Sequence, residues 1–315
     1  MYKICILGIY FGNLPSYFPL WLESCKYNST VDFLIINDQN ITDLPVNVRQ
    51  VKMSFNDFRV LVQSKFDFPV SLERPYKICD FKPAFGLICS EYIQGYDFWG
   101  HCDFDMIFGD IRKYITDDLL NSYDKILPLG HLSIYRNNEE NNSRFKLSGS
   151  LVGDYKKVFT TDKSFAFDET RGIYQIYKTN FLPVYDKRIF ADISSIYRRF
   201  RLALDDVNYE YQIFSFDKGR IFREYILNRK YNKEEFIYLH IKKPKHLEIK
   251  TDNYQRYFIT NTGFYEKNGD ATLDDIEKYN KYRGALFEQS EKIAFIIKNK
   301  YQRFIEKLKE FTKVK

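Results

Sequence analysis

Apolar residues in the first hundred positions fall into short continuous runs, each closed by a glycine or a polar residue. Residues 3–9 and 31–37 are the clearest examples. Apolar runs of this length are typical of strands that are buried on both faces, as in parallel sheets. Residues 48–53 and 97–102 also fit short strands, so we expect four strands in this part of the chain.

The segments between these runs have the pattern of helices. A helix is expected from about Pro15, because proline is tolerated in the first turn. Ser54 is a plausible cap for a second helix that continues through Phe66, and residues 80–94 predict a third. Strands that alternate with helices predict an α/β fold, Rossmann-like, with a mostly parallel central sheet and flanking helices.

The middle of the chain has more strand-like segments, and its end is helical. Further strands are expected at residues 125–137, 146–153, 181–186 and 235–241, and a loop leading into a helix at 165–180. After about residue 245 the pattern changes, and residues 272–315 predict one or two amphipathic helices. We expect a main domain at 1–245 and a C-terminal region at 246–315 that ends in a helical extension.

Composition indicates a folded protein with reduced cysteines. The 315 residues are 44% hydrophobic and 29% charged, which is enough apolar material for a buried core and argues against disorder. The five cysteines are odd in number and lack CxxC spacing, which favours a reducing, cytoplasmic compartment. No stretch approaches the roughly 20 apolar residues of a membrane span, and the first residues are better explained as a strand than as a signal peptide.

Positive charge is concentrated at the C-terminal end. Residues 291–315 contain eight Lys or Arg and three Glu, a net charge of +5 out of the +6 of the whole chain. The nearly neutral remainder argues against a nucleic-acid-binding protein. Apolar residues recur in this segment at three- and four-residue steps, which predicts a basic amphipathic helix suited to an anionic membrane surface. The alternative is a helix packed on the rest of the protein or in a coiled coil.

Two carboxylates follow the strand expected at residues 97–102, in the triplet Asp103-Phe104-Asp105. Residues two apart in a strand point the same way, so both acids could reach one hard divalent cation, Mn²⁺ or Mg²⁺. Such triplets also occur by chance. Here, however, the triplet ends a buried strand, where unpaired carboxylates are costly, and Asp38 falls at the end of another strand. Ligands of open α/β sheets bind beyond these strand ends.

The residues around this triplet resemble a known family. RPYKICDFKPAFG (74–86) followed by YDFWGHCDFDMIFGDI (96–111) is similar to bacterial glycosyltransferases of GT-A type that assemble surface polysaccharides such as capsule and O-antigen. GHLSIYRN (130–137), FDETRGI (167–173) and YLHIKKP (238–244) also look like segments of that family. The resemblance covers roughly residues 3–245 and implies a GT-A fold with a DxD motif.

The resemblance implies a metal and diphosphate site. Asp103 and Asp105 would hold the metal ion and the diphosphate of a nucleotide-sugar, and His240 would complete the metal shell. Lys242 or Lys243, close to His240 in the sequence, would grip the diphosphate. A histidine at a strand end is often only structural, and this alternative stays open for His240.

The resemblance also implies a site for the nucleotide base. Gly8, Tyr10 and Gly12 lie in the loop after the first strand, which in GT-A folds cups the base. Tyr10 would stack on a uracil, and Asp38 would accept a hydrogen bond from the base. The alternative for Tyr10 is one more surface aromatic residue.

Acids and one lysine elsewhere are candidates for sugar binding and catalysis. Asp80 and Lys82 open the helix before the motif strand and would contact the sugar, ribose or phosphate, although Asp80 could be a helix cap and Lys82 a solvated lysine. Asp168 and Glu169 are the candidate base of an inverting transfer. In a retaining enzyme these two acids would only bind the acceptor, and either could instead cap a helix. His131 could also touch the acceptor.

The resulting hypothesis is a metal-dependent glycosyltransferase, an inverting hexosyltransferase, that acts in cell-surface polysaccharide synthesis. Its donor would be a nucleotide-sugar, a UDP-sugar, and its acceptor a glycan or a lipid-linked glycan at the inner face of the cell membrane. One alternative is a metal-dependent nucleotidyltransferase or phosphotransferase, although no glycine-rich phosphate loop is present. Another is a non-catalytic carbohydrate-binding protein.

Overall fold

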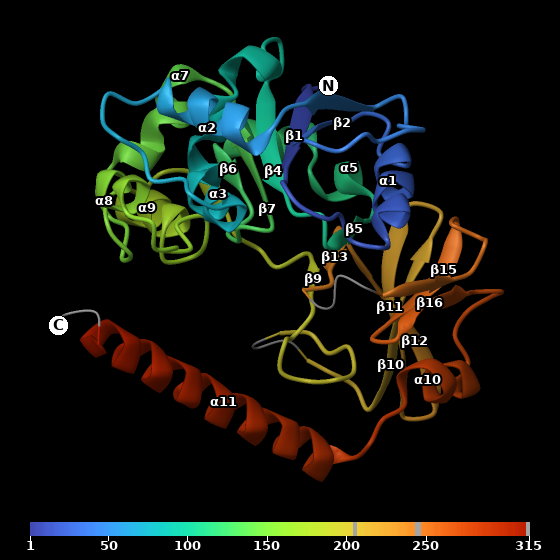
Figure 1. Ribbon diagram of the computed structural model, residues 1–315. Coiled ribbons are helices and arrows are strands. Elements are labelled where there is room, and N and C mark those ends of the chain that lie inside the picture. Colours follow the sequence, from blue (N-terminus) through green and yellow to red (C-terminus); the bar gives the residue numbers. More distant parts are fainter. Residues whose placement is uncertain (204–206, 243–246, 313–315) are drawn as a thin grey trace.

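A seven-stranded sheet forms the centre of the N-terminal part of the computed structural model (Figure 1). The structure describes residues 1–203, 207–242 and 247–312, apart from the side chains of residues 303 and 306–312. The strand order is β3-β2-β1-β4-β7-β6-β8, and only β7 runs antiparallel to the others. The strands are β1 (Ile4–Ile9), β2 (Asp32–Asn37), β3 (Val48–Lys52), β4 (Phe98–Cys102), β6 (Lys125–Ile126), β7 (Leu132–Arg136) and β8 (Val184–Tyr185). The four strands expected first are all present, and the α/β fold is confirmed.

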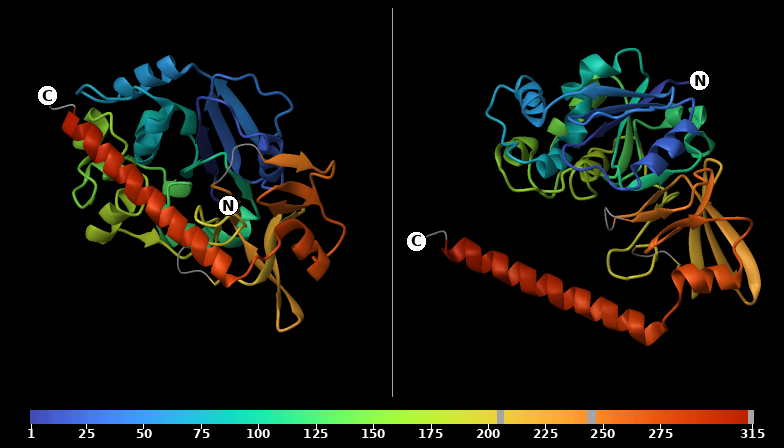
Figure 2. Two further views of the ribbon diagram at one scale, coloured as in Figure 1. Left: turned by 60° about the horizontal axis from the view of Figure 1, so that its bottom comes forward. Right: turned by 45° about the vertical axis from the view of Figure 1, so that its right-hand side comes forward.

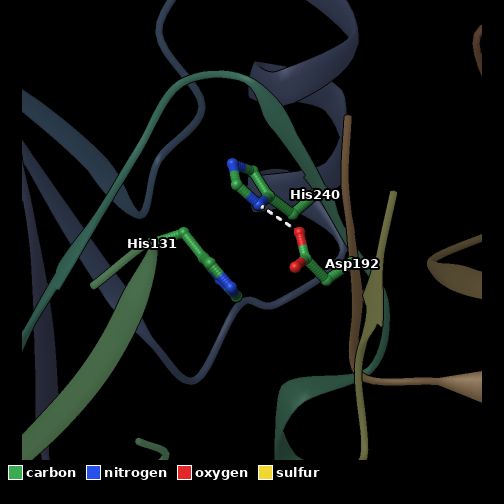
Figure 3. Close-up of side chains that lie close together, drawn as sticks. All are labelled: His131, Asp192 and His240. Atoms are coloured by element: carbon green, nitrogen blue, oxygen red, sulfur yellow. Dashed lines mark hydrogen bonds and ion pairs between the residues drawn. The ribbon is translucent and has the colours of Figure 1, made fainter. Parts of the chain in front are cut away.

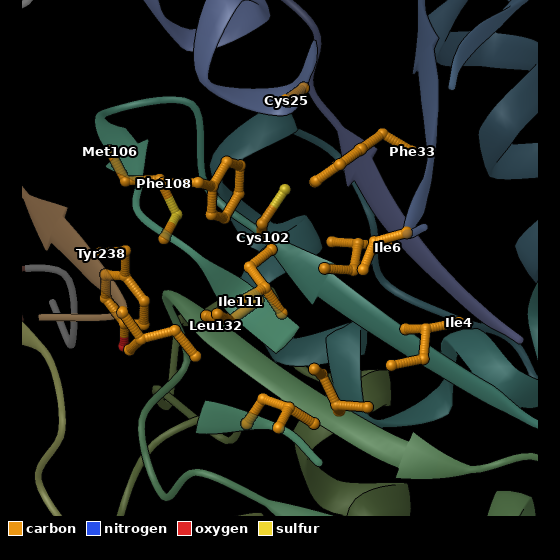
Figure 4. Packing of buried hydrophobic residues seen from close by; sticks show 14 of the residues in the cluster. Ile4, Ile6, Cys25, Phe33, Cys102, Met106, Phe108, Ile111, Leu132 and Tyr238 are labelled. Carbon is orange, nitrogen blue, oxygen red and sulfur yellow. The ribbon is translucent and has the colours of Figure 1, made fainter. Parts of the chain in front are cut away.

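Helices cover both faces of this sheet. Alternate residues of β1 enter two separate cores: Ile4 and Ile6 pack with α1, whereas Cys5 and Leu7 pack with α2 and the short helices beyond it. Figure 4 shows part of the first core. The helices are α1 (Phe18–Lys26), α2 (Phe55–Gln63), α3 (Ile78–Phe81), α4 (Phe85–Ile88), α5 (Ile111–Tyr114), α6 (Asp117–Ser122), α7 (Glu139–Ser143), α8 (Tyr155–Thr160) and α9 (Ile173–Thr179). Burial on both faces explains why β1 and β2 are nearly continuous apolar runs.

A second sheet of six strands lies beside α1 and was not expected from the sequence (Figure 1). Its strands, in the order in which they pair, are β12 (Lys230–Phe236), β11 (Arg220–Leu227), β10 (Tyr211–Asp217), β15 (Arg256–Thr260), β16 (Gly263–Glu266) and β14 (Glu248–Lys250). Its core includes Tyr17 and Leu20 next to Phe214 and Tyr257, so α1 and the residue before it contact this sheet as well as the first. The sheet takes strands from both sides of residue 245, where we expected the main domain to end.

A small third sheet joins the two larger ones. In it β13 (Tyr238–His240) pairs antiparallel with β5 (Met106–Phe108) and parallel with β9 (Ala191–Asp192). Met106 and Tyr238 belong to the same core as Ile4 and Ile6 of β1 (Figure 4). The chain around residue 240 is therefore held against the end of β4 by both hydrogen bonds and apolar packing.

Three expected elements differ from the structure. Residues 125–137 form two short antiparallel strands, β6 and β7, instead of one. Residues 80–94 do not form one helix, because Pro83 lacks the N–H that a continuing helix needs, and short α and 3₁₀ turns replace it. The strand expected at residues 146–153 is absent and this prediction was wrong. Gly149 and Gly153 have φ values of +121° and +132°, which a strand does not accept.

The chain ends in α10 (Leu273–Asn280) and the long α11 (Ala285–Thr312), as the helical pattern predicted. Figures 1 and 2 show α11 extending away from the second sheet. Its first turns are tied to the rest of the protein through Glu288, which forms ion pairs with Arg199 and Arg201. Within the described residues, no helix has the length and apolar character needed to cross a membrane.

Phe104 is the apolar anchor that turns its two acidic neighbours outward, and its removal should destabilise the protein. Its ring packs 4.9 Å from Trp21 and fills the space beside Gly8, where an added Cβ would lie 2.7 Å from the ring. Phe104→Ala should lower the free energy of unfolding by about 3–5 kcal/mol, measured by urea denaturation. Phe104→Leu, which keeps most of the volume, should cost clearly less. A loss below about 1 kcal/mol for Phe104→Ala would contradict this role.

Candidate metal and nucleotide site

The two acids of the triplet lie in the bend between β4 and β5 rather than within a strand. Phe104 between them is 3% exposed, whereas the side chains of Asp103 and Asp105 are about one-third exposed. The backbone N–H of Asp103 donates to the carbonyl of His131, and the carbonyl of Asp105 accepts from the N–H of Ile241. These bonds fix the bend, and both carboxylates point away from the core that holds Phe104.

His240 lies between two carboxylates, one from the bend after β4 and one from β9. Its Nε2 is 3.3 Å from Oδ1 of Asp105, and its Nδ1 is 2.8 Å from Oδ1 of Asp192, as Figure 3 shows for the second contact. A carboxylate at Nδ1 holds the proton on that nitrogen, which leaves Nε2 as the nitrogen that can bind a metal ion. Lys242 also contacts Asp192, with Nζ 3.2 Å from Oδ2. Asp192 was not among the residues singled out from the sequence.

Burial and neighbouring charges shift the pKa values of His240, Asp105 and Asp103. Burial by itself lowers the pKa of His240, but the bonds and charges of Asp105 and Asp192 outweigh it and raise that pKa to about 9. For Asp105, burial raises the pKa, but His240 outweighs this effect and the net pKa is below the usual value. The pKa of Asp103 is raised, mainly by burial and against the opposing charge of Lys82.

Among the residues that the structure describes, two groups of side chains have the spacing of a metal site. Asp103, Asp105 and His240 form one, and His131, Asp192 and His240 form the other. In the second group the rings of His131 and His240 are stacked, with centroids 4.2 Å apart and planes at 28°. An imidazole binds a metal in its own plane at about 2.1 Å, so one ion cannot readily reach a nitrogen of both rings. Figure 3 shows how His131, Asp192 and His240 lie relative to one another.

The first group is therefore the better candidate. It offers two carboxylate oxygens and one imidazole nitrogen, a donor set that suits Mn²⁺, and Mg²⁺ through the carboxylates. The partial exposure of both carboxylates leaves room for the water and phosphate oxygens with which these ions complete their shells. His131 and Asp192 then lie behind this group. The ring of His131 stacks on the ring of His240, and Asp192 accepts the hydrogen bond from Nδ1 of His240.

Lys82 connects the triplet to the acids expected in catalysis. Its Nζ lies 2.7 Å from Oδ1 of Asp103 and 3.1 Å from Oδ2 of Asp168, and it donates to the carbonyl of Gly130 at 2.9 Å. Burial lowers the pKa of Lys82, but Asp103, Cys79 and Asp168 outweigh it, so the ammonium stays charged. The expected lysine of the CDFKPA segment is thus buried between two carboxylates rather than solvated.

Asp168 and Glu169 lie side by side next to Gly130. Burial raises the pKa of Asp168 to about 7, against the charge of Lys82 and with that of Glu169. Burial also raises the pKa of Glu169. Asp168 is 4% exposed, whereas Glu169 is partly exposed. A side chain at Gly130 would begin 2.3 Å from Oδ2 of Asp168, so glycine is needed for this close approach.

Asp80 supports this part of the site from behind. It is fully buried, its carboxylate pairs with Lys77 at 2.8 Å, and it accepts the backbone N–H groups of Phe165 and Phe167. These contacts fix the segment that leads into Asp168. The structure therefore does not bring Asp80 to the triplet, and its carboxylate has no exposed face for a ligand.

The residues expected around a base lie at the ends of β1 and β2. The Tyr10 ring meets Phe104 edge-on at 5.8 Å, Gly12 has a φ of +129°, and Gln39 donates from its side chain to the Gly12 carbonyl. Asp38 is exposed at the end of β2. Gly8 itself faces Phe104. The loops after β1 and β2 therefore meet beside the triplet, whereas Lys243 lies outside the described residues.

Three residues at this site were not found from the sequence: Asp192, Tyr238 and Tyr17. Tyr238 hydrogen-bonds Nδ1 of His131 at 2.8 Å, and burial together with Asp105 raises the pKa of Tyr17. The Tyr17 hydroxyl has no hydrogen-bond partner within the described part of the chain. Each of these residues reaches the site only through tertiary contacts, so no spacing in the sequence indicates it.

Comparisons with known proteins place the chain in a family. The model of the family described as "Family of unknown function (DUF6625)" matches residues 6–268, and the chain belongs to this family. No curated protein matches the sequence. Among solved structures, that of the galactosyltransferase LgtC in complex with donor and acceptor sugar analogs matches at 12% identity and a TM-score of 0.34, over 60% of this chain and 75% of that one. A likeness this distant says nothing about the site.

The raised pKa of His240 predicts that metal binding by this candidate group would depend on pH. Because Nε2 must be free of its proton to bind a metal, a folded-state pKa of about 9 means that each metal ion displaces close to one proton at pH 7. Mn²⁺ affinity should rise by up to about tenfold per pH unit between pH 7 and 8.5 and level off above pH 9. Titration calorimetry in buffers of different ionisation enthalpy measures the displaced proton. In His240→Gln this dependence should vanish, and a flat native profile would contradict the assignment.

Proposed function

We propose that this chain is a divalent-metal-dependent glycosyltransferase that transfers a sugar from a nucleotide-sugar to a glycan or lipid-linked acceptor. The observation that carries the proposal is the group Asp103, Asp105 and His240, which lies beyond the carboxyl end of β4 and beside the loops after β1 and β2. Open α/β sheets bind nucleotides at this edge. Carboxylates, one imidazole and a glycine-containing loop at that edge suit a nucleoside diphosphate that carries a metal ion.

The donor proposed is a UDP-sugar. Its base would lie against Tyr10 and the loop at Gly12, with Asp38 as hydrogen-bond acceptor, and its diphosphate would lie at Asp103 and Asp105. A bound Mn²⁺ or Mg²⁺ would neutralise the charge that develops on the diphosphate leaving group. Lys82 holds Asp103 in place, and Lys242, at Asp192, adds a positive charge behind His240.

Sugar transfer in this proposal is inverting. The acceptor oxygen forms a bond to the anomeric carbon as the bond from that carbon to the diphosphate breaks, and the hydroxyl proton passes to a carboxylate. Glu169 is the acid that an acceptor hydroxyl can reach, because Asp168 is buried against Lys82. Asp168, with a pKa of about 7, is the second member of the pair. The two acids lie on the far side of Lys82 from the metal group.

The acceptor side of the proposal is a membrane surface. Exposed apolar side chains follow one face of α11: Leu286, Ile293, Ile296, Ile297, Tyr301 and Phe304. Glu288, on the opposite face, is tied to Arg199 and Arg201, which turns the apolar face away from the protein. The surrounding lysines complement anionic headgroups. We therefore place the enzyme on the inner face of the cell membrane, where a lipid-linked acceptor of capsule-type polysaccharide synthesis would be found.

The donor site is tested with Mn²⁺ and a panel of UDP-sugars. The native protein should bind UDP only with metal and should slowly release UDP from one of the donors. Asp105→Asn should weaken metal-dependent UDP binding by at least about 100-fold, since it removes a charged ligand, while the exposed Asp118→Asn should match the native protein. Titration calorimetry and a UDP-release assay measure the two effects.

The reaction products distinguish sugar transfer from the two alternative functions. Release of UDP indicates sugar transfer, whereas release of UMP or transfer of a nucleotidyl group would indicate a nucleotidyltransferase. Binding of free sugar without metal-dependent UDP binding would indicate a carbohydrate-binding protein and end the transferase proposal. Glu169→Gln should lose transfer while it keeps UDP binding, which separates a role in the reaction from a role in the fold.

Vesicle binding tests the membrane surface. Replacing Ile293, Ile297 and Tyr301 together with serine should reduce co-sedimentation with phosphatidylglycerol vesicles at least about tenfold, because each side chain contributes about 1–3 kcal/mol when buried in the interface. Asn299→Ser with Gln302→Ser, on other faces of α11, is the matched control. Equal sedimentation of both variants would show that the apolar face does not bind lipid.

A further inference from the structure

A cavity of about 210 Å³ lies where α10 and the start of α11 meet the segment that follows β9. Its lining is mainly basic, and five of the lining residues are Lys or Arg: Arg198, Arg199, Lys278, Lys281 and Arg283. This volume is well above the roughly 10–15 Å³ that one water molecule needs by the same measure. This is room for a small charged headgroup.

The two acids in this lining are already neutralised. Glu288 pairs with Arg199 at 2.8 Å and with Arg201, and Glu291 lies 3.5 Å from Arg198. In contrast, Lys278, Lys281 and Arg283 form no ion pair with any residue that the structure describes. The cavity therefore keeps an excess of positive charge, which favours an anion.

A buried amide side chain favours a ligand that also carries a hydrogen-bond donor. Asn280 is 2% exposed and lines the cavity, and its side-chain N–H donates to the carbonyl of Gln212 at 2.8 Å. Its Oδ1 has no hydrogen-bond partner within the described residues. A buried acceptor left unpaired costs about 1–3 kcal/mol, so a ligand with a hydroxyl group would be stabilised here. Phe287 and Glu288 bring the positive end of α11 to the same cavity.

One short segment links this cavity to the metal group. Asp192 contacts His240, and six residues later Arg198 reaches the cavity. The segment folds back on itself, because Ile193 pairs with Leu202 and the N–H of Ser194 donates to the carbonyl of Arg201 at 2.7 Å. Six residues span at most about 20 Å. The backbones of Asp192 and Arg198 therefore lie within about 20 Å of each other.

We propose that this cavity binds a phosphate group carried by a hydroxyl-bearing headgroup, and so forms an anion subsite on the acceptor side. The cations bind the phosphate, and Asn280 accepts a hydrogen bond from a hydroxyl. Only the role as acceptor subsite rests on the proposed function, because binding of the phosphate itself requires neither metal nor nucleotide. The phosphate can come from a soluble polyol phosphate or from a lipid headgroup.

The test measures binding of glycerol 1-phosphate and of phosphatidylglycerol vesicles to the full chain. Lys281→Gln with Arg283→Gln should weaken binding at least tenfold, and Asn280→Asp, which adds a negative charge without adding volume, should do the same. Lys156→Gln with Lys230→Gln, both exposed and far from the cavity in the chain, is the matched control and should stay within twofold. Thermal melts confirm that all variants are folded.

The two binding measurements distinguish a soluble phosphate from a lipid headgroup. They also distinguish this subsite from the proposed donor site. Loss of both soluble phosphate and vesicle binding in the cavity variants supports the subsite, and loss of vesicle binding alone assigns the phosphate to a lipid headgroup. Equal binding by the cavity and control variants overturns the proposal, as does absence of both kinds of binding in the native protein. Metal-dependent UDP binding should be unchanged in the cavity variants, so failure of the donor site and failure of this subsite are distinguished.

Discussion

The candidate site depends on the pairing of β13 with two short strands. His240 lies opposite Met106 of β5 and beside Asp192 of β9, so the backbone ladder alone decides which carboxylates its two nitrogens meet. Since Met106 directly follows Asp105, the same pairing brings the histidine to the triplet. Tyr238, two residues before His240, is buried in the core of the main sheet and prevents the strand from shifting. A one-residue slip would turn His240 to the opposite face.

Concentrated negative charge is the second constraint. Asp103, Asp105, Asp168, Glu169 and Asp192 gather around two buried cations, Lys82 and His240. Two like charges 4 Å apart repel by about 4 kcal/mol at an effective dielectric constant near 20, so the acids are held only because neighbouring groups oppose the repulsion. The carboxylates of Asp105 and Asp192 raise the pKa of His240 against the effect of burial, whereas burial is the main cause of the raised pKa of Asp168 and the charge of Glu169 adds to it. A divalent cation at Asp103 and Asp105 would relieve it further.

Much of the first sheet could be predicted, because β1, β2 and β4 are buried and the sequences of β1 and β2 are nearly continuous apolar runs. The second sheet could not. Most residues of its β12, KYNKEEF, are polar and exposed, so the segment resembles a polar loop until its partner strands are known. The triplet and His240 were chosen from the sequence and do lie together. Asp192 was missed because its two-residue strand carries no pattern, and Asp80 was taken for a ligand contact although it is bonded to the backbone of Phe165 and Phe167.

The central claim is that one divalent ion binds at Asp103, Asp105 and His240 and carries a nucleoside diphosphate. A crystal structure with Mn²⁺ and UDP, with the ion located by its anomalous scattering, tests this most directly. The account expects a single Mn²⁺ peak within about 2.3 Å of Nε2 of His240 and of an Asp105 oxygen, with the diphosphate completing its shell. A peak between His131 and Asp192, or UDP bound away from the triplet, would contradict it.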